Sequence, residues 1–208
     1  WWVLDAAHPY AEVLRHTVAS ACQQLAVPLT RYQRPSDIDV LTHPLLHKVD
    51  SPAAACALAQ AFGPRVLLTT GSKQLAEYQR GLGGKHLMVR VLPTAEVLAH
   101  CEQLGLAVDR IFALCGPFTA DFNRALYQFC QPDVVITKES GAPGGYQDKV
   151  LPCLERNIPC IVVQRPPTVE PAGQDRVHNL NEFALSLARW QQRPHAKGGV
   201  PLYVAHHK

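Results

Sequence analysis

Short apolar runs alternate with helical segments of about ten residues along most of the chain. This alternation is typical of parallel β-sheets covered by helices on both faces, because each parallel strand needs a crossover to return to the same edge. The pattern predicts strands over residues 1–6, 28–31, 65–69, 87–91, 110–115, 133–137 and 159–164. It predicts helices over residues 10–25, 51–62, 72–78, 94–104, 120–130, 147–156 and 181–191. We therefore expect an α/β protein.

The composition narrows the classes of partner. Of the 208 residues, 47% are apolar and 18% are charged, and the formal net charge is +3. This apolar content excludes a disordered chain, and no stretch reaches the roughly 18 uncharged apolar residues of a membrane span. Since the weak positive charge is not clustered into a basic stripe, neither a nucleic acid nor a membrane is an expected partner.

The cysteines indicate a reducing compartment. Their number is odd, no pair has C-x-x-C spacing, and most lie in apolar stretches, so we expect reduced thiols that fill the core as small hydrophobes. Such usage is typical of a cytoplasmic protein. The seven are Cys22, Cys56, Cys101, Cys115, Cys130, Cys153 and Cys160.

The pattern divides into two parallel-sheet α/β units. We expect the remainder of an N-terminal domain over residues 1–50, a C-terminal domain over 51–170, a C-terminal helix over 171–192 and a flexible tail over 193–208. The opening sequence WWVLD is typical of a buried strand already in progress, and no initiator Met precedes it. The first unit is therefore expected to be incomplete and to lack its natural N-terminus.

Four turns that follow predicted strands are candidate sites, because ligands of open parallel sheets bind beyond the carboxyl ends of the strands. In the first of them, His8 could act as an acid, contact a ligand or simply cap the turn. The four turns are residues 5–10, 69–73, 115–119 and 137–146.

The second turn, Thr70-Gly71-Ser72-Lys73, could bind phosphate. Gly71 allows the backbone to approach a ligand, Ser72 offers a hydroxyl, and Lys73 adds positive charge beside free N–H groups at a helix start. The turn is not a Walker A loop, since G-x-x-x-x-G-K-[ST] is absent. A helix-capping turn is the alternative interpretation.

The fourth turn contains Gly141, Gly144 and Gly145 directly after a strand. Three glycines within five residues indicate a loop that adopts positive φ or admits a ligand. Lys138 and Glu139 place opposite charges at the start of this loop. A solvent-exposed flexible loop is the alternative.

Other catalytic patterns are absent from the sequence. His43 and His47 have a metal-like spacing, but Pro44 separates them and no Cys or carboxylate ligand accompanies them, so we expect no metal site. Neither G-x-S-x-G nor H-E-x-x-H occurs.

Five segments, in order and spacing, resemble the precorrin-6A reductase family of the cobalamin pathway. The resemblance covers roughly residues 4–166. Ala7 stands where the family usually has Thr, and the strand, G-G-T turn and helix that open family members are absent. The segments are 5–11 (DAAHPYA), 67–73 (LLTTGSK), 89–94 (VRVLPT), 115–118 (CGPF) and 135–145 (VITKESGAPGG).

The resemblance implies two Rossmann-like domains with a pyridine nucleotide in a cleft between them. It implies that NADPH reduces a double bond of the precorrin-6A macrocycle to give precorrin-6B. Related enzymes of the anaerobic route act on cobalt-precorrin-6A and can use NADH. The substrate is a large, flat, multiply carboxylated ring, and other enzymes of the pathway are potential partners.

The turns and the resemblance together give a set of expected site residues. The expected catalytic residues are His8, Lys138 and Glu139. Cofactor binding is expected at Thr70, Gly71, Ser72, Lys73, Gly116, Pro117 and Phe118. Substrate binding is expected at Asp5, His8, Tyr10, Thr137, Lys138, Ser140, Gly141, Gly144 and Gly145.

Two other hypotheses stay open at this point. One is a truncated, non-catalytic module that binds a nucleotide or a tetrapyrrole. The other is an unrelated α/β enzyme such as a glycosyltransferase-like protein. Turnover of precorrin-6A with NADPH distinguishes the reductase from both.

Overall fold

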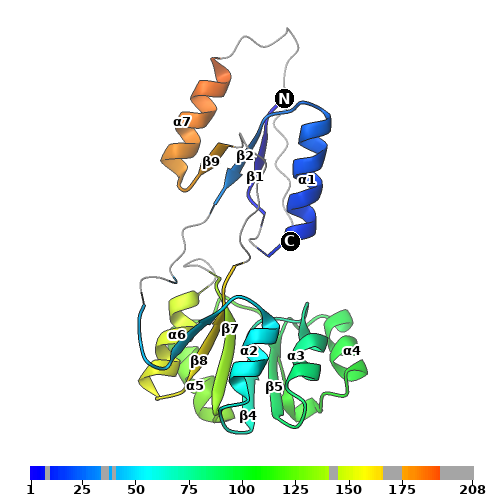
Figure 1. Ribbon diagram of the computed structural model, residues 1–208, viewed down its shortest axis with the longest axis vertical. Helices are drawn as coiled ribbons and strands as arrows, with labels where there is room; N and C mark the ends of the chain where they lie inside the picture. Colours follow the sequence, from blue (N-terminus) through cyan, green and yellow to red (C-terminus); the bar gives the residue numbers. More distant parts are fainter. Residues whose placement is uncertain (8–9, 34–37, 39–40, 141–144, 166–174, 193–208) are drawn as a thin grey trace. The chain divides into compact units, whose positions relative to one another are not determined.

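The computed structural model describes residues 1–7, 10–33, 38, 41–140, 145–165 and 175–192. The chain forms two compact units (Figure 1), one of residues 1–34 with 168–208 and the other of residues 35–167. These limits differ from the sequence-based boundaries at residues 50 and 170. Residues 46–49 pair with the larger sheet, and residues 175–191 belong with the smaller one.

The described part of the smaller unit has three parallel strands in the order β1-β2-β9. The helix α7 is attached to this sheet through Trp2, whose indole stacks on Phe183 at 5.7 Å and on Trp190 at 5.8 Å. Trp2 Nε1 also donates a hydrogen bond to Thr30 Oγ1 at 2.9 Å. The elements are β1 (Val3–Asp5), α1 (Glu12–Gln24), β2 (Leu29–Tyr32), β9 (Asp175–Val177) and α7 (Leu180–Gln191).

The larger unit has, within its described residues, six parallel strands in the order β3-β8-β7-β4-β5-β6. Its strands are β3 (Leu46–Val49), β4 (Arg65–Leu68), β5 (His86–Val91), β6 (Ile111–Ala113), β7 (Val134–Lys138) and β8 (Cys160–Val163). Its helices are α2 (Pro52–Ala59), α3 (Leu75–Gly81), α4 (Ala95–Gln103), α5 (Ala120–Cys130) and α6 (Tyr146–Glu155), with a 3-10 turn over Val108–Arg110.

The strand order places a topological switch between β4 and β7. The chain enters the middle of the sheet at β4, moves outward to β5 and β6, and then returns to β7 on the other side of β4. One face of the sheet packs on α2, α3 and α4, and the other packs on α5 and α6 (Figure 1). The segments that follow β4 and β7 therefore leave the sheet toward opposite faces, and ligands of open parallel sheets bind at such a switch point.

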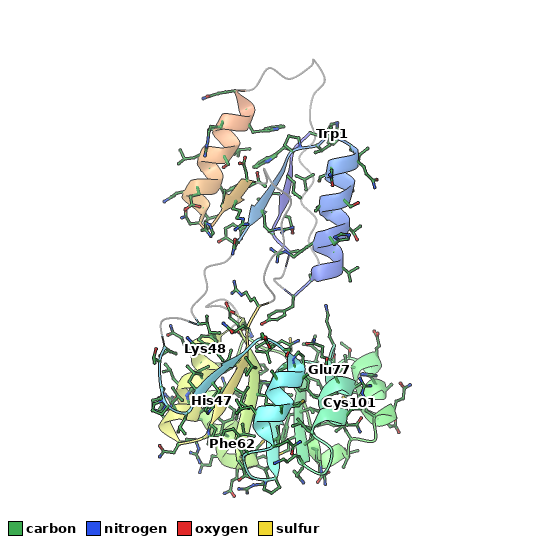
Figure 2. All side chains as sticks on the ribbon, viewed as in Figure 1. Trp1, His47, Lys48, Phe62, Glu77 and Cys101 are labelled. Carbon is green, nitrogen blue, oxygen red and sulfur yellow. The ribbon has the colours of Figure 1, made fainter. Side chains whose placement is uncertain are left out.

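The core of the larger unit forms on both faces of the sheet, as continuous apolar strands require. Tyr78 on one face, and Tyr127 and Tyr146 on the other, are fully buried. Six of the seven cysteines are buried and form no disulfide, among them Cys101 on α4 (Figure 2), so the predicted core role is confirmed for these six. Cys115 is exposed, and the prediction is wrong there.

Local signals place most helix starts correctly. Ser51 caps α2 by accepting a hydrogen bond from the Ala54 backbone N at 3.2 Å, with Pro52 at the first helical position. The strands β3 and β9 escape the sequence pattern because β3 contains His47 and Lys48 and β9 has only three residues. The predicted tail over 193–208 lies outside the described residues. None of the described helices is both long and apolar enough to cross a bilayer.

Candidate functional site

The switch between β4 and β7 brings two of the predicted turns to one point of the sheet edge. The backbone N of Thr69 donates to the Ile136 carbonyl oxygen at 2.9 Å, and Thr69 Oγ1 lies 3.4 Å from the same oxygen. These bonds fix the end of β4 beside the end of β7. The turn 69–73 and the loop that begins at Lys138 therefore start next to each other.

Two hydroxyl groups at this edge are buried without a hydrogen-bond partner in the described chain. They are Thr70 Oγ1 and Thr137 Oγ1, and the Thr137 side chain is 0% exposed. A buried hydroxyl that makes no hydrogen bond costs about 1–3 kcal/mol, so native proteins rarely leave one. Both residues belong to the predicted site, where a polar group of a ligand or an ordered water could satisfy these hydroxyls.

The backbone at Gly71 leaves room for such a ligand. Its φ is +79°, and a Cβ built on it would have no atom within 4 Å. Ser72 does not cap the following helix with its hydroxyl, since the N-cap position of α3 is Gln74 and has no side-chain capping bond. The structure thus gives no support to the helix-capping alternative for Ser72. Lys73 is exposed.

Glu139 forms a hydrogen bond and an ion pair with Arg165, and these contacts limit the reactions in which its carboxylate can take part. Its carboxylate accepts the Arg165 backbone N–H at 3.0 Å through Oε2 and lies 3.2 Å from Arg165 Nε through Oε1. The Glu139 side chain is 4% exposed. The geometry favours a positioning role for Glu139, because both its oxygens are already engaged. Lys138, the last residue of β7, is half-buried.

Asp5 is likewise engaged within the smaller unit. Its Oδ2 lies 3.1 Å from Arg31 Nε, and its Oδ1 accepts the Ala7 backbone N–H at 2.9 Å. Asp5 and Arg31 are register partners on neighbouring parallel strands. This buried pair shapes the start of the first turn, and substrate binding by Asp5 stays a prediction.

Several predicted residues cannot be placed or stand apart. His8, Gly141 and Gly144 lie outside the described residues. Tyr10 is half-buried in the first turn. Gly145 occupies the N-cap position of α6 with φ +65°, as the glycine pattern predicted.

The third turn supplies an aromatic surface. Phe118 stacks on Phe122 with ring centres 4.9 Å apart, while Gly116 and Pro117 are exposed. Thr119 caps α5 by accepting the Phe122 backbone N–H at 3.2 Å. Phe118 is therefore held by the first turn of α5, and the exposed Gly116 and Pro117 lie beside it.

Sequence reasoning assigned no role to Arg90, a charged residue inside an apolar strand. Arg90 is 6% exposed, and its Nη1 donates to Asn123 Oδ1 at 2.7 Å. Its guanidinium carbon lies 4.2 Å from the centre of the Phe118 ring. Burial lowers the pKa of Arg90 below its ordinary value. An arginine in the run LMVRV was the available signal.

Lys149 of α6 was also missed. Its Nζ donates to Ser140 Oγ at 3.1 Å, which links the start of the fourth turn to α6. Burial, with a further contribution from the nearby charge of Arg90, lowers the pKa of Lys149 to about 8. A single lysine on an amphipathic helix carries no sequence signal that separates it from a surface lysine.

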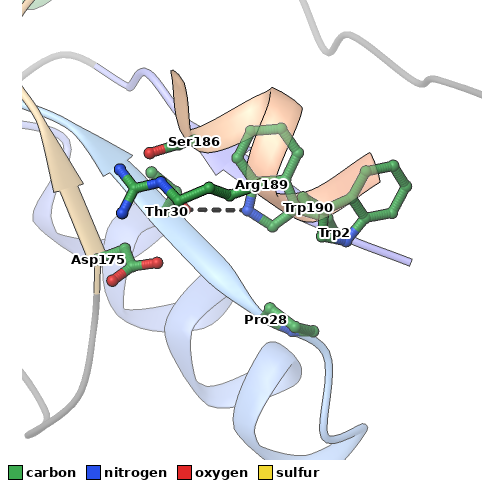
Figure 3. Close-up of a pocket in the computed structure, with 7 residues that line it drawn as sticks. All are labelled: Trp2, Pro28, Thr30, Asp175, Ser186, Arg189 and Trp190. Carbon is green, nitrogen blue, oxygen red and sulfur yellow. Dashed lines mark hydrogen bonds between the residues drawn. The ribbon is translucent and has the colours of Figure 1, made fainter. Parts of the chain in front are cut away.

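The smaller unit has a small pocket at the amino ends of its strands. Trp2 and Trp190 form one wall, and Thr30, Asp175 and Arg189 line the rest (Figure 3). Trp2 precedes β1 and Asp175 begins β9, so the pocket opens at the amino ends of the strands. Ligands of parallel sheets bind at the carboxyl ends, so this pocket is not our candidate site.

The two histidines with metal-like spacing are used locally. His43 Nδ1 accepts the Leu45 backbone N–H at 3.1 Å, and the His47 ring lies 5.7 Å from the Phe62 ring (Figure 2). Within the part of the chain that the structure describes, no three His, Cys, Asp or Glu side chains gather in a metal-binding group.

Comparisons with known proteins agree on one family. The family described as "Precorrin-6x reductase CbiJ/CobK" matches residues 1–187. The cobalt-precorrin-6A reductase of Salmonella typhimurium is 56% identical over 189 residues, which cover 91% of this chain and 72% of the relative. The cobalt-precorrin-6A reductase of Priestia megaterium is 34% identical, with 86% and 72% covered. The solved structure named CobK precorrin-6A reductase superposes with a TM-score of 0.70 at 25% identity, over 89% and 71% of the two chains.

Proposed function

The chain belongs to the precorrin-6x reductase CbiJ/CobK family. We propose that it reduces cobalt-precorrin-6A with a nicotinamide dinucleotide as the hydride donor. As a member of this family it is an oxidoreductase of cobalamin biosynthesis, a precorrin-6A reductase. The choice of the cobalt-containing substrate over cobalt-free precorrin-6A is a proposal. Its support is that both relatives named above, at 56% and 34% identity, are cobalt-precorrin-6A reductases, whereas the protein named for precorrin-6A is 25% identical.

The main support for this site is a pair of hydroxyl groups at the β4–β7 switch that have no hydrogen-bond partner in the described chain. A nicotinamide dinucleotide offers phosphate and ribose oxygens that can bond to Thr70 Oγ1 and Thr137 Oγ1. Thr137, which the sequence assigned to substrate binding, is here proposed as a cofactor residue. The empty space over Gly71 allows a phosphate to approach the main chain, and Lys73 is exposed beside it. These residues fit the cofactor. When bound, the dinucleotide supplies a hydride, and the protein supplies binding, orientation and electrostatics.

The remaining residues of the same edge are assigned to the substrate. Lys138 is half-buried at the end of β7, and Ser140 follows two residues later beside α6. A cation and a hydroxyl at this position can bind carboxylates of a large tetrapyrrole ring. Glu139 keeps the loop in place through Arg165, and we give it no proton-transfer role.

Turnover of the substrate tests the proposed function. The chain is incubated with cobalt-precorrin-6A and either NADPH or NADH, and the gain of one hydride and one proton by the macrocycle is followed by mass spectrometry. A parallel reaction uses cobalt-free precorrin-6A. We expect faster turnover of the cobalt form. Faster turnover of the cobalt-free form would reverse the substrate assignment, and binding of both ligands without turnover would indicate a non-catalytic module.

A further inference from the structure

The larger unit contains a buried positive charge that no carboxylate of the described chain neutralises. Arg90 is held by a neutral amide, the Oδ1 of Asn123 at 2.7 Å, and by the face of the Phe118 ring at 4.2 Å. Its Nε and Nη2 make no hydrogen bond to any described residue. A buried charge ordinarily has an opposite charge beside it, because removing an isolated ion from water is costly. Arg90 departs from this rule.

The neutral partner of Arg90 is rigidly placed. Asn123 is 0% exposed, and its Nδ2 donates to the Thr119 carbonyl oxygen at 2.9 Å. This bond fixes the amide so that Oδ1 faces the guanidinium. An aspartate would have a similar size and would neutralise Arg90, but it would lose the bond that Nδ2 donates to Thr119. The residue present leaves the positive charge available to a ligand.

A second cation without a carboxylate within ion-pair distance lies at the same edge. Lys149 Nζ has one hydrogen bond in the described structure, to the neutral Ser140 Oγ at 3.1 Å. The backbone of Lys149 is held by the Tyr127 hydroxyl, which donates to its carbonyl oxygen at 3.0 Å. The charge of Arg90 contributes to the lowered pKa of Lys149, as expected of two like charges close together.

The backbone brings these two cations to one place. Arg90 is the second-last residue of β5 and lies on the same face as Met88, which packs in the core beneath α5 and α6. The Phe118 carbonyl oxygen lies 3.6 Å from the position of a Cβ built on Gly145. The carbonyl of Gly145 accepts the backbone N–H of Lys149 at 3.2 Å. The turn that holds Arg90 is therefore packed against the first turn of α6, at the carboxyl edge where ligands bind.

We propose that Arg90 and Lys149 together form a receptor for one oxyanion of a ligand, a carboxylate or a phosphate group. The free Nε and Nη2 of Arg90 form a fork suited to two oxygens of such a group, and Lys149 adds a point charge. The oxyanion would supply the negative charge that the chain lacks here. This inference rests on the proposed function only for the source of the oxyanion: a carboxylate comes from the tetrapyrrole and a phosphate from the dinucleotide.

Binding measurements on charge-removing variants test the receptor. Arg90→Met keeps the apolar stem and removes the charge, and Lys149→Gln removes the second charge from a less buried position. Arg80→Gln, which removes an exposed arginine at the end of α3, is the matched control. Dissociation constants are measured for NADPH and for uroporphyrin, a flat tetrapyrrole rich in carboxylates. Circular dichroism and Tm confirm that each variant is folded.

We expect Arg90→Met and Lys149→Gln each to weaken the binding of one of the two probes by about tenfold or more, while Arg80→Gln leaves both affinities unchanged. A loss confined to uroporphyrin identifies a substrate carboxylate, and a loss confined to NADPH identifies a cofactor phosphate. If Arg90→Met does not fold, Lys149→Gln alone decides between the outcomes. Unchanged affinities for both probes in the folded variants would overturn the receptor. Wild-type turnover, measured separately, distinguishes this failure from failure of the proposed reaction.

Discussion

Arg90 and Asn123 form a buried hydrogen bond of 2.7 Å in which a full positive charge meets a neutral amide. The pair joins β5 to α5 directly beneath the turn that contains Phe118. Because the amide does not neutralise the charge, the hydrogen bond fixes the position of Arg90 while its positive charge can still attract an anion. This relationship makes a specific prediction about Asn123.

Asn123→Asp should neutralise Arg90 with little change in shape. We expect the variant to fold, because the new carboxylate faces the Arg90 cation at hydrogen-bond distance, but with a Tm below that of the wild type, since its oxygen cannot donate to the Thr119 carbonyl as Asn123 Nδ2 does. Binding of the oxyanion should weaken by about tenfold, since its site is now paired internally. Asn123→Leu is the control that removes the hydrogen bond without adding charge. Undiminished affinity of Asn123→Asp for both NADPH and uroporphyrin would contradict this reading of the pair.

Lys149 should make stability and oxyanion binding depend on pH. Its pKa is about 8 in the folded chain and 10.5 ordinarily, so the unfolded chain holds the proton to higher pH. The stability that the neutral amine contributes is therefore present above pH 10.5 and is lost as the pH falls through 8. Denaturant titrations should show the wild type gaining on the order of 2 kcal/mol relative to Lys149→Gln between pH 8 and 10.

Comparing the stability of the wild type with that of Lys149→Gln also controls for the titration of neighbouring groups. Arg90, Asp148 and Cys160 act on the charge of Lys149, and Tyr127 and Cys153 bond to its carbonyl oxygen. All of them are present in both proteins, so their own titration cancels to first order. Oxyanion affinity should fall as the pH rises above 8, because the amine loses its charge. A difference in stability that stays constant from pH 8 to 10 would exclude the lowered pKa.

Glu139 should matter for structure more than for chemistry. Glu139→Gln removes the charge opposite Arg165 while keeping the shape, so we expect a loss of stability of about 1–3 kcal/mol. We expect kcat to change by no more than about threefold. Arg165→Gln, which breaks the same pair from the other side, should show a similar stability loss. A fall in kcat of about 10²-fold or more in Glu139→Gln alone would restore the catalytic role predicted from the sequence.

Gly71→Ala separates backbone strain from ligand contact. Gly71 and Gly105 have φ values of +79° and +71°, and an added Cβ would meet no atom within 4 Å at either position. Each substitution should therefore destabilise the fold by about 1–2 kcal/mol through strain. Only Gly71→Ala should weaken NADPH binding, because only that glycine lies at the β4–β7 switch. Equal NADPH affinities in the two variants would remove Gly71 from the cofactor site.

Sequence periodicity was sufficient for five of the six strands of the larger sheet but not for β3 or for the unit boundaries. Continuous apolar runs such as Val134–Lys138 identify buried parallel strands without any tertiary information. The strand β3 is partly polar and joins the distant β8, and such long-range pairing has no local signal. The unit boundaries moved for the same reason.

The candidate site was also only partly accessible from the sequence. The turns at Gly71 and Gly145 were predictable because positive φ favours glycine. Arg90 was noticeable as a charged residue in an apolar strand, but its role could not be inferred, since that role depends on Asn123 and Phe118, which come near it only in the folded chain. Glu139 was assigned a catalytic role from its place beside Lys138, because its ion pair with Arg165, 26 positions away, has no local sequence signal.

Substitutions of Thr70 and Thr137 test whether the β4–β7 switch binds the dinucleotide. In Thr70→Val and Thr137→Val a buried, unbonded hydroxyl is replaced by a methyl group of similar size. Such replacements should leave Tm unchanged or raise it, because no hydrogen bond within the described chain is lost. Thr69→Val is the control, since the Thr69 hydroxyl lies 3.4 Å from the Ile136 carbonyl oxygen.

The decisive measurement is the dissociation constant for NADPH in Thr70→Val, determined together with its Tm. We expect an affinity at least about fivefold weaker than that of the wild type, in a protein that is as stable or more stable. Thr69→Val should bind NADPH as the wild type does. Wild-type affinity in both Thr70→Val and Thr137→Val would show that the cofactor binds elsewhere.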